Sequence, residues 1–431
     1  MQERRVAIVG AGPSGLAAAR ALQRVGIRAT GFEAGPGVGG LWDIDNPRST
    51  MYESAHLISS RTTTEFAEFP MATDADYPGH RVLVEYFRRY AAHFGLADLF
   101  RFETKVTSVT RAGNGWEVTA SGPDGTTTES FDAVVLANGT LAEPRVPTFP
   151  GEFTGEIFHT SQYKRAQQLA GRRVLIIGAG NSGCDIAVDA VHHAASVEMS
   201  VRRGYYFVPR YLFGRPADTL NQGRPLPARL KQLVDTRVLR AFTGDPVRFG
   251  FPKPDYRIYE SHPIVNTLIL NHLGQGDLRI RSDVERFDGN SVHFRDGSSG
   301  EYDTVLLATG YTLDYPFVDR AALNWSRAAP DLFLNIFPPS LNGLFVMGMV
   351  EASGLGWQGR YEQAELAAAY LTAAPETQAA FRRRIADEPW PDLTGGYRYL
   401  GLDRMSYYVN KDAYRGAVTR ATAALNEGTH G

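Results

Sequence analysis

Short apolar runs that end in glycines recur along the chain and predict its main elements. Val6 to Val9 is apolar without alternation, as expected for a strand buried on both faces of a parallel sheet. Glycines follow it, residues 16–25 have a helical pattern, and residues 28–33 resemble a second strand. The same order returns in "RRVLIIGAGNSGCDIAVDAV". The pattern therefore predicts an α/β protein with two Rossmann-type dinucleotide-binding domains.

The first glycine turn has the spacing G-x-G-x-x-G between a predicted strand and a predicted helix. In this pattern one glycine permits a tight turn, the next lets the backbone approach a pyrophosphate, and the third allows close helix–strand packing. The second strand ends at Glu33, whose carboxylate would bond ribose hydroxyls. Cofactor contacts are expected at this turn from Gly10, Gly12, Pro13, Ser14, Gly15 and Glu33.

The second glycine turn differs from the first at the end of its second strand. Arg202 and Arg203 stand where the first unit has Glu33. Guanidinium groups pair with a 2′-phosphate that a carboxylate would repel, so the first site suits FAD or NAD and the second suits NADP. The alternative is that both arginines are only solvent-exposed residues at the end of a strand and bind no ligand. The expected contacts here are Gly178, Gly180, Asn181, Ser182, Gly183, Arg202 and Arg203.

Two further segments repeat one pattern, and a long insert interrupts the second unit. "FDAVVLANG" (131–139) and "YDTVLLATG" (302–310) each predict a buried strand that ends beside a nucleotide. Residues 115–131 predict a hairpin that turns at Pro123 to Gly125. We expect a first domain over 1–165 and 285–431 and a second over 166–284. Within the second, the aromatic and proline-rich insert at about 204–266 predicts a lid or pocket wall without a charged anchor, with a helical patch around 230–242.

Composition narrows the classes of function. The chain has 431 residues, a net charge of −2 and no basic block, so nucleic-acid binding is not expected. Its single cysteine, Cys184, excludes a C-x-x-C disulfide reductase and suits a reducing cytoplasm. No apolar run approaches the roughly 20 residues of a membrane span. We expect no metal and no membrane partner. Two dinucleotide folds in one chain suggest electron transfer between two cofactors.

The segment "FTGEIFHTSQY" between the two turns has the form F-x-G-x-x-x-H-x-x-x-(Y/F), filled by Phe153, Gly155, His159 and Tyr163. Together with "GGLW" (39–42) and "ATGY" (308–311), it resembles the flavin-containing monooxygenases, the N- and S-oxygenating relatives of the Baeyer–Villiger monooxygenases. The motif ends in Tyr163-Lys164, where Baeyer–Villiger enzymes usually have Trp-Pro. The resemblance therefore leans towards heteroatom oxygenation.

This resemblance implies FAD in the first domain and NADPH in the second. NADPH would reduce the flavin, O2 would add to give a C4a-hydroperoxide, and a nitrogen or sulfur of a small molecule would attack it. His159 would orient the cofactors and couple the domains. Oligomeric state stays open, with a homodimer as one alternative. The resemblance adds to the cofactor residues Gly40, Leu41, Trp42, Thr309, Gly310 and Tyr311.

The sequence departs from the family where its members often carry a peroxide-supporting asparagine. The corresponding residues here are Leu57-Ile58-Ser59-Ser60. Because Ile58 cannot donate a hydrogen bond, Ser59 or Ser60 is the expected catalytic donor. Three alternatives stay open: ketone oxygenation, a non-catalytic dinucleotide sensor, and a peroxide-releasing NADPH oxidase or flavin reductase, which the missing asparagine makes more credible.

Overall fold

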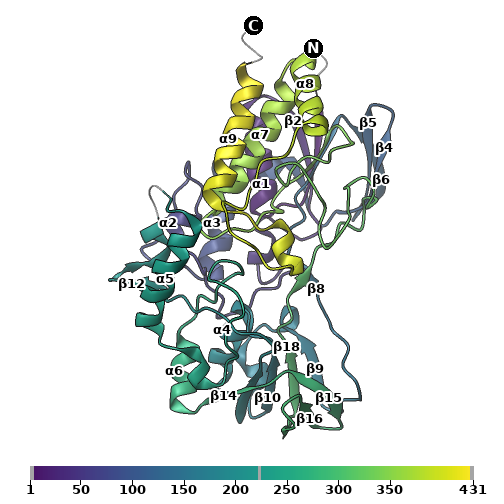
Figure 1. Ribbon diagram of the computed structural model, residues 1–431. Coiled ribbons are helices and arrows are strands. Elements are labelled where there is room, and N and C mark those ends of the chain that lie inside the picture. The colour runs from purple at the N-terminus through teal and green to yellow at the C-terminus, as the bar shows by residue number, and fades with distance from the viewer. Residues whose placement is uncertain (1–3, 222–224, 428–431) are drawn as a thin grey trace.

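The computed structural model describes residues 4–221 and 225–427 (Figure 1). Its first unit is built on a five-stranded parallel sheet. The central strand is β1 (Arg5–Val9), four of whose five residues are buried, as the apolar run predicts. Helix α1 (Pro13–Arg24) follows it and packs against α7 (Gln358–Thr372). The strand order of this sheet is β20 (Leu344–Val346), β7 (Ala133–Leu136), β1, β2 (Arg28–Phe32) and β3 (Phe100–Arg101).

Further elements of the first unit surround this sheet. The expected hairpin is confirmed: β5 (Gly115–Gly122) and β6 (Gly125–Phe131) pair antiparallel, with Gly122 opposite Gly125. Strand β4 (Lys105–Ala112) completes that three-stranded sheet. The remaining helices are α2 (Arg61–Thr64), α3 (His80–His93), α8 (Pro375–Asp387) and α9 (Lys411–Glu427), with short 3-10 turns at Gly40–Trp42, Ala97–Leu99 and Asp403–Tyr407.

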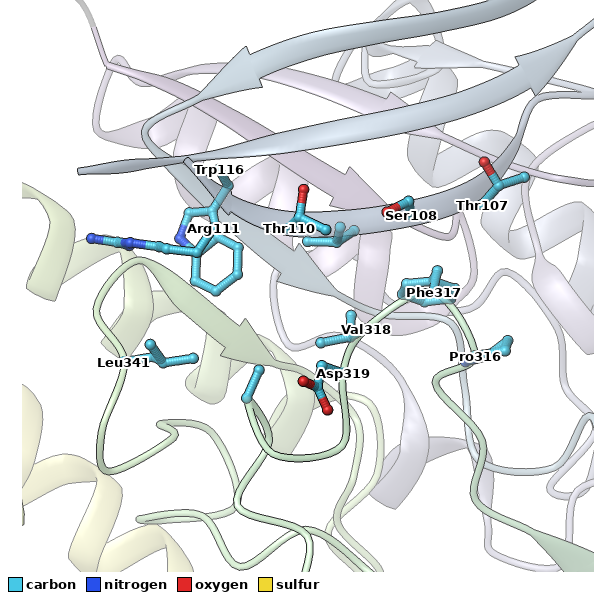
Figure 2. Close-up of a pocket in the computed structure, with 12 residues that line it drawn as sticks. Thr107, Ser108, Thr110, Arg111, Trp116, Pro316, Phe317, Val318, Asp319 and Leu341 are labelled. Atoms are coloured by element: carbon cyan, nitrogen blue, oxygen red, sulfur yellow. The ribbon is translucent and has the colours of Figure 1, made fainter. Parts of the chain in front are cut away.

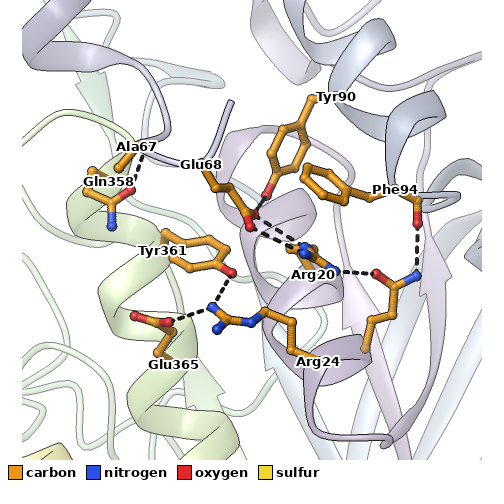
Figure 3. A network of polar contacts seen from close by, with 10 residues as sticks. Arg20, Arg24, Ala67, Glu68, Tyr90, Phe94, Gln358, Tyr361 and Glu365 are labelled. Carbon is orange, nitrogen blue, oxygen red and sulfur yellow. Dashed lines mark hydrogen bonds and ion pairs between the residues drawn. The ribbon is translucent and has the colours of Figure 1, made fainter. Parts of the chain in front are cut away.

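A polar network ties α1 to its neighbours α3 and α7 (Figure 3). Arg20 of α1 donates to Glu68 at 3.3 Å, and Glu68 also accepts from Tyr90 of α3 at 2.9 Å. Arg24 of α1 donates to Tyr361 and Glu365 of α7, both at 3.1 Å. Such partly exposed pairs each contribute about 0–1 kcal/mol. The larger contribution comes from the buried aromatic rings beside them, Phe66, Tyr86, Phe87, Tyr90 and Trp357.

The second unit has its own five-stranded parallel sheet, which lies below the first in Figure 1. Its central strand β10 (Arg173–Ile177) is followed by α4 (Asn181–Ala190) and β11 (Ser196–Ser200), which repeats the order of the first unit. Helix α6 (Leu268–Gln275) packs against α4. The other strands of this sheet are β14 (Leu278–Arg281), β18 (Thr304–Leu307) and β9 (Glu156–His159), and an antiparallel sheet of β15 (Val284–Asp288), β16 (Ser291–Phe294) and β17 (Ser299–Glu301) adjoins it.

Strand pairing extends the second unit on both sides of the expected range 166–284. β18 pairs with β10, and β9 pairs with β18, so both strands belong to the second sheet although they were expected in the first domain. All four residues of β18 are buried, because this strand lies between two neighbours. The strand pairing thus corrects the domain limits: the second unit covers about residues 156–307, and the chain returns to the first unit after β18.

The insert lies along one side of both units, with α5 and β12 labelled there in Figure 1. The expected helical patch is part of α5 (Ala228–Thr243). The backbone amide of Leu400 donates to the carbonyl of Glu260, which connects the end of the insert to the first unit. Of the described helices, none is long and apolar enough to cross a membrane. The other short elements are β12 (Tyr211–Leu212), β13 (Arg215–Pro216), and 3-10 turns at Ala217–Asn221 and Pro246–Phe249.

Candidate active site

The first glycine turn joins β1 to α1 with a backbone that only glycine fits at two positions. Gly10 has φ +103°, and a Cβ there would lie 2.6 Å from the carbonyl oxygen of Ala137. A Cβ on Gly15 would lie 1.8 Å from the carbonyl oxygen of Gly10. At Gly12, by contrast, a Cβ would meet only Gly40, at 3.7 Å. The turn is therefore closed on its protein side and roomier at Gly12, as a bound pyrophosphate requires.

Glu33 lies at the end of β2 and is only 7% exposed. Its Oε2 accepts a hydrogen bond from the amide of Ala11, and its Oε1 accepts one from the amide of Gly35, both at 2.7 Å. Each carboxylate oxygen keeps further acceptor capacity, which ribose hydroxyls can use. Helix α1 has no side-chain cap at its N-cap Gly12, so its first amides remain available to a phosphate. These features fit an FAD dinucleotide.

Residues 39–42 and two later segments enclose this turn. A Cβ on Gly40 would lie 3.0 Å from the Cα of Gly12, which places the Gly40–Leu41–Trp42 turn beside the glycines. The rings of Trp42 and Trp357 meet edge to face with centroids 6.1 Å apart. The amide of Trp357 donates to the carbonyl of Thr64 at 2.7 Å. Trp42, a predicted cofactor residue, is thus connected through Trp357 to Thr64, which closely follows the residues at the family's asparagine position.

The second glycine turn repeats the geometry of the first. Gly178 has φ +107°, and a Cβ there would lie 2.5 Å from the carbonyl oxygen of Ala308. A Cβ on Gly183 would lie 2.3 Å from the carbonyl oxygen of Gly178. At Gly180 a Cβ would meet nothing within 4 Å, and α4 has no side-chain cap. The residues at this turn therefore fit the pyrophosphate of a second dinucleotide.

The side chains around the second turn divide into two groups. Asn181 is held by the protein, since it donates to the carbonyl of Pro263 at 3.2 Å and accepts from the amide of Val265 at 2.7 Å. Arg202 is exposed, and among the described residues the Arg203 guanidinium forms an ion pair with Asp255 at 3.6 Å. Both arginines can therefore turn to a 2′-phosphate at little structural cost. Ser182 follows Asn181 in the first turn of α4.

Cys184 has no reactive role in this arrangement. It is fully buried in α4, and its thiol lies 3.6 Å from the carbonyl oxygen of Ala179. Burial raises the pKa of this thiol well above its usual value, with Asp185 contributing in the same direction. A cysteine of this kind stays protonated and packs as a small apolar residue.

His159 ends β9 and links it to the turn after β18. Its Nδ1 accepts from the amide of Ser161 at 3.1 Å, so Nε2 carries the hydrogen and donates to the carbonyl of Gly310 at 3.0 Å. Burial lowers the pKa of His159, although the bond to Gly310 opposes that shift. The ring of Tyr311 lies edge to face with it at 5.2 Å, and Thr309 donates to the carbonyl of Arg145 at the same turn. His159 is thus a neutral histidine that fixes residues 309–311.

Ser59 and Ser60 use their hydroxyl hydrogens within the protein. Thr64 donates its hydroxyl to the carbonyl of Ser60 at 2.7 Å, so in the 2.7 Å contact between Ser59 and Thr64 the serine must be the donor. Ser60 donates to Oδ2 of Asp218 at 3.0 Å. In this arrangement neither serine has a hydrogen left for a ligand, and their role as catalytic donors stays a prediction.

Comparison with known proteins agrees with this geometry. A family model described as flavin-binding monooxygenase-like matches residues 3–374. The chain belongs to this family. Flavin-containing monooxygenase 5 of Cavia porcellus is 32% identical over 381 residues, covering 82% of this chain and 70% of that protein. Flavin-containing monooxygenase 1 of Rattus norvegicus is also 32% identical, over 377 residues, covering 81% and 70%.

Solved structures share the fold of this flavin monooxygenase. The S-allyl-L-cysteine S-oxygenase from Allium sativum has a TM-score of 0.67 at 23% identity and covers 97% of this chain and 88% of its own. An open cyclohexanone monooxygenase has a TM-score of 0.71 at 19% identity, covering 99% and 98%. Family membership makes the chain an FAD-dependent, NADPH-using monooxygenase, and the two turns accommodate these cofactors.

A group of charged and titratable residues connects the insert to the C-terminal segment, and the expectation of a pocket wall without a charged anchor stays a prediction. Arg404 donates to Glu351 at 3.0 Å, and its positive charge lowers the pKa of Glu351 against the opposing effect of burial. His262 of the insert contacts Tyr408 at 3.3 Å, and burial and then Arg404 lower its pKa to about 3. These residues are far apart in sequence, so no local motif could reveal the cluster.

A separate hollow of about 550 Å³ lies in the first unit (Figure 2). Strands β4 and β5 form one wall and residues 316–322 form another, with Trp116, Phe317 and Val318 among the lining side chains. None of the lining residues belongs to either glycine turn or to residues 59–64. This hollow is therefore separate from the residues that are predicted to bind the two cofactors.

Proposed function

We propose that this flavin monooxygenase uses NADPH and O2 to oxygenate a nitrogen or sulfur atom of a small molecule. The observation that carries the proposal is the contrast between two matching glycine turns in one chain. The first is completed by the buried carboxylate of Glu33, and the second by the guanidinium groups of Arg202, which is exposed, and Arg203, which has a 3.6 Å contact to Asp255. FAD, when bound at the first turn and reduced by NADPH from the second, supplies the oxygen activation.

The chain's own residues bind, orient and exclude water. Glu33 and the first turn hold the dinucleotide of FAD, while Arg202 and Arg203 pair with the 2′-phosphate of NADPH. His159 keeps residues 309–311 in place through its bond to Gly310. We expect the insert and the wall of Trp357 and Thr64, which the bond from the Trp357 amide to the Thr64 carbonyl holds together, to exclude water from the oxygenation site.

The end of the His159 motif supports a nitrogen or sulfur acceptor over a ketone. Tyr163 donates to Asp189 at 2.5 Å, and Lys164 donates to the carbonyl of Ser49 at 2.6 Å. This Tyr-Lys pair stands where the ketone-oxygenating relatives usually have Trp-Pro. A soft nitrogen or sulfur nucleophile also needs no protein base, and no free base is evident among the described site residues. The S-oxygenase from Allium sativum is a structural neighbour with the corresponding substrate class.

One observation favours a peroxide-releasing oxidase as a second candidate. The hydroxyl hydrogens of Ser59 and Ser60 are used within the protein, so residues at the family's asparagine position offer no ready donor to an oxygenated flavin. We infer that coupling is imperfect, with part of the reducing power of NADPH released as hydrogen peroxide.

A matched substrate panel tests the proposal. The holoenzyme is incubated with NADPH, in air, with a thioether, a tertiary amine or a cyclic ketone of similar size, and products are identified by mass spectrometry. We expect a sulfoxide or an N-oxide. A lactone as the main product would support ketone oxygenation instead, and peroxide without any oxygenated product would support the oxidase.

A further inference from the structure

Asp218 lies where the insert meets the segment at the family's asparagine position. It belongs to the 3-10 turn Ala217–Asn221 of the insert. Its Oδ2 accepts three hydrogen bonds from that segment: from the amide of Ser60 at 2.7 Å, the hydroxyl of Ser60 at 3.0 Å and the hydroxyl of Thr63 at 2.5 Å. Hydrogen bonds to a carboxylate are about twice as strong as neutral ones.

The carboxylate reaches a nearly closed site. Ser60 is 1% exposed, and Oδ1 of Asp218 is buried with no hydrogen-bond partner among the described residues. Two flanking contacts support the same docking: Tyr211 donates to Asp76 at 3.0 Å, and Tyr77 donates to the carbonyl of Arg210 at 2.5 Å. The insert therefore meets residues 60–77 through several polar contacts, with Asp218 at the buried end.

The segment held by Asp218 continues into the wall of the first site. Ser60 is the N-cap of α2, and the carbonyl of Thr64 at the other end of α2 accepts from the amide of Trp357. A Cβ on Gly356 would lie 2.3 Å from the carbonyl oxygen of Thr63, so α2 and this wall are in direct backbone contact. A shift of Ser60 must therefore move the backbone next to Trp357.

We propose that Asp218 is a positioning residue for oxygenation, an inference that rests on the proposed function. Through Ser60 and Thr63 it fixes the backbone of residue 60 and of α2 in the position that the docked insert sets. Docking of the insert and closure of the oxygenation site are then one event. Without Asp218 the insert and α2 separate, water enters, and NADPH oxidation releases more peroxide.

The test compares Asp218→Ala and Asp218→Asn with Asp245→Asn. Asparagine keeps one acceptor oxygen but loses the charge, and alanine removes all three bonds. Asp245 is a suitable control because it lies on the same insert, where it accepts from the amide of Val247 and from Arg240, away from residues 60–64. Flavin content and anaerobic reduction by NADPH are measured for each holoenzyme as internal controls. Neither should change, because Asp218 contacts neither glycine turn.

Hydrogen exchange reports the positioning role directly. In Asp218→Ala we expect exchange of the Ser60 amide to rise roughly tenfold or more, with a smaller rise at Trp357, because a bond to a charged group is lost. Peroxide released per NADPH with a thioether should rise several-fold, with Asp218→Asn in between and the control unchanged. Flavin content and reduction rate should stay within about twofold.

Two results would overturn the inference. Unchanged exchange at residues 60–64 in Asp218→Ala would show that the contact fixes nothing, and an unchanged peroxide fraction would show that the contact does not serve oxygenation. If alanine fails to give folded protein, the same two measurements on Asp218→Asn decide. If wild-type enzyme gives no oxygenated product, the proposed function fails, while the exchange experiment still reports whether Asp218 holds the segment.

Discussion

The two glycine turns have the same backbone conformation. They differ in how the protein holds the side chains that select the ligand. Gly10 and Gly178 have φ values of +103° and +107°, and each backs onto a carbonyl oxygen, of Ala137 and of Ala308. In the first unit Glu33 is buried and bonded to two backbone amides. In the second unit Arg202 is exposed, and Arg203 is more than a third exposed.

In the first unit one residue, Glu33, both stabilises the turn and binds the ligand, whereas in the second unit these two tasks belong to different residues. Glu33 both braces the turn through Ala11 and Gly35 and offers oxygens to a ribose, so its loss should affect stability and ligand binding together. Arg202 and Arg203 brace little of the described structure, so their loss should affect ligand binding alone. Substitutions in the two units therefore test whether this difference is real.

The largest effects are expected at the third glycine of each turn. Gly15→Ala would place a Cβ 1.8 Å from a backbone oxygen, and Gly183→Ala one at 2.3 Å. We expect Gly15→Ala to lose bound flavin, and Gly183→Ala to keep flavin but lose reduction by NADPH. Flavin absorbance and anaerobic stopped flow measure this. Gly401→Ala is the control, because a Cβ there meets nothing within 4 Å. Equal loss of flavin in both turn variants would contradict the assignment.

Glu33→Ala should act on stability and on flavin at once. It leaves two amides without an acceptor, which costs about 1–3 kcal/mol for each amide that stays buried and unpaired. We expect a lower unfolding temperature of the apoprotein and less bound flavin, with activity recovering when excess FAD is added. Glu33→Gln, which keeps one acceptor oxygen, should lie in between. Full flavin occupancy with lost activity would assign Glu33 to catalysis and refute this account.

Arg202→Ala and Arg203→Ala should weaken NADPH binding without changing stability. A lost charge-assisted contact to the 2′-phosphate is worth about 1.5–3 kcal/mol, roughly 10- to 100-fold in Kd. NADH binding should hardly change, because NADH lacks this phosphate. Cofactor titration of the single and double variants, beside thermal unfolding, measures both quantities. An equal loss of affinity for NADPH and for NADH would show that the arginines do not bind the 2′-phosphate.

The smallest effect is expected from the pH dependence of His159. Burial lowers its pKa in the folded state, so protons bind preferentially to the unfolded chain. The stability that the neutral ring contributes is present above about pH 6.5, the usual histidine value, and is lost as pH falls towards the lower folded pKa. In His159→Gln we expect the fall in Tm between pH 7.5 and 5.5 to shrink by roughly a few degrees. An unchanged pH profile would mean that His159 is not held neutral.

Local sequence patterns were sufficient to predict both glycine turns, the hairpin and the helix of the insert. Each depends on residues within about 30 positions, such as Gly10 to Glu33, and its steric reason is local. The repeated "FDAVVLANG" and "YDTVLLATG" segments also lie beside equivalent strands: Asp132 accepts from the amide of Arg5 at 2.7 Å, and Asp303 from that of Arg173 at 2.8 Å.

Contacts distant in sequence could not be predicted in this way. β18 and β9 are about 150 residues apart, and only their pairing assigns them to the second sheet. Asp218 lies 158 positions from Ser60, and Glu351, Arg404 and His262 come from three separate segments. Sequence periodicity carries no information about which loop a carboxylate in an irregular insert will meet.

The most direct test of the central claim is the oxygen balance under 18O2. The holoenzyme is supplied with NADPH and a thioether, and NADPH consumed, peroxide released and 18O in the sulfoxide are measured together. We predict one 18O atom per sulfoxide, with sulfoxide and peroxide together equal to the NADPH consumed and sulfoxide the larger share. Sulfoxide without label, or peroxide accounting for all NADPH with every thioether and tertiary amine tried, would contradict a monooxygenase acting on sulfur or nitrogen.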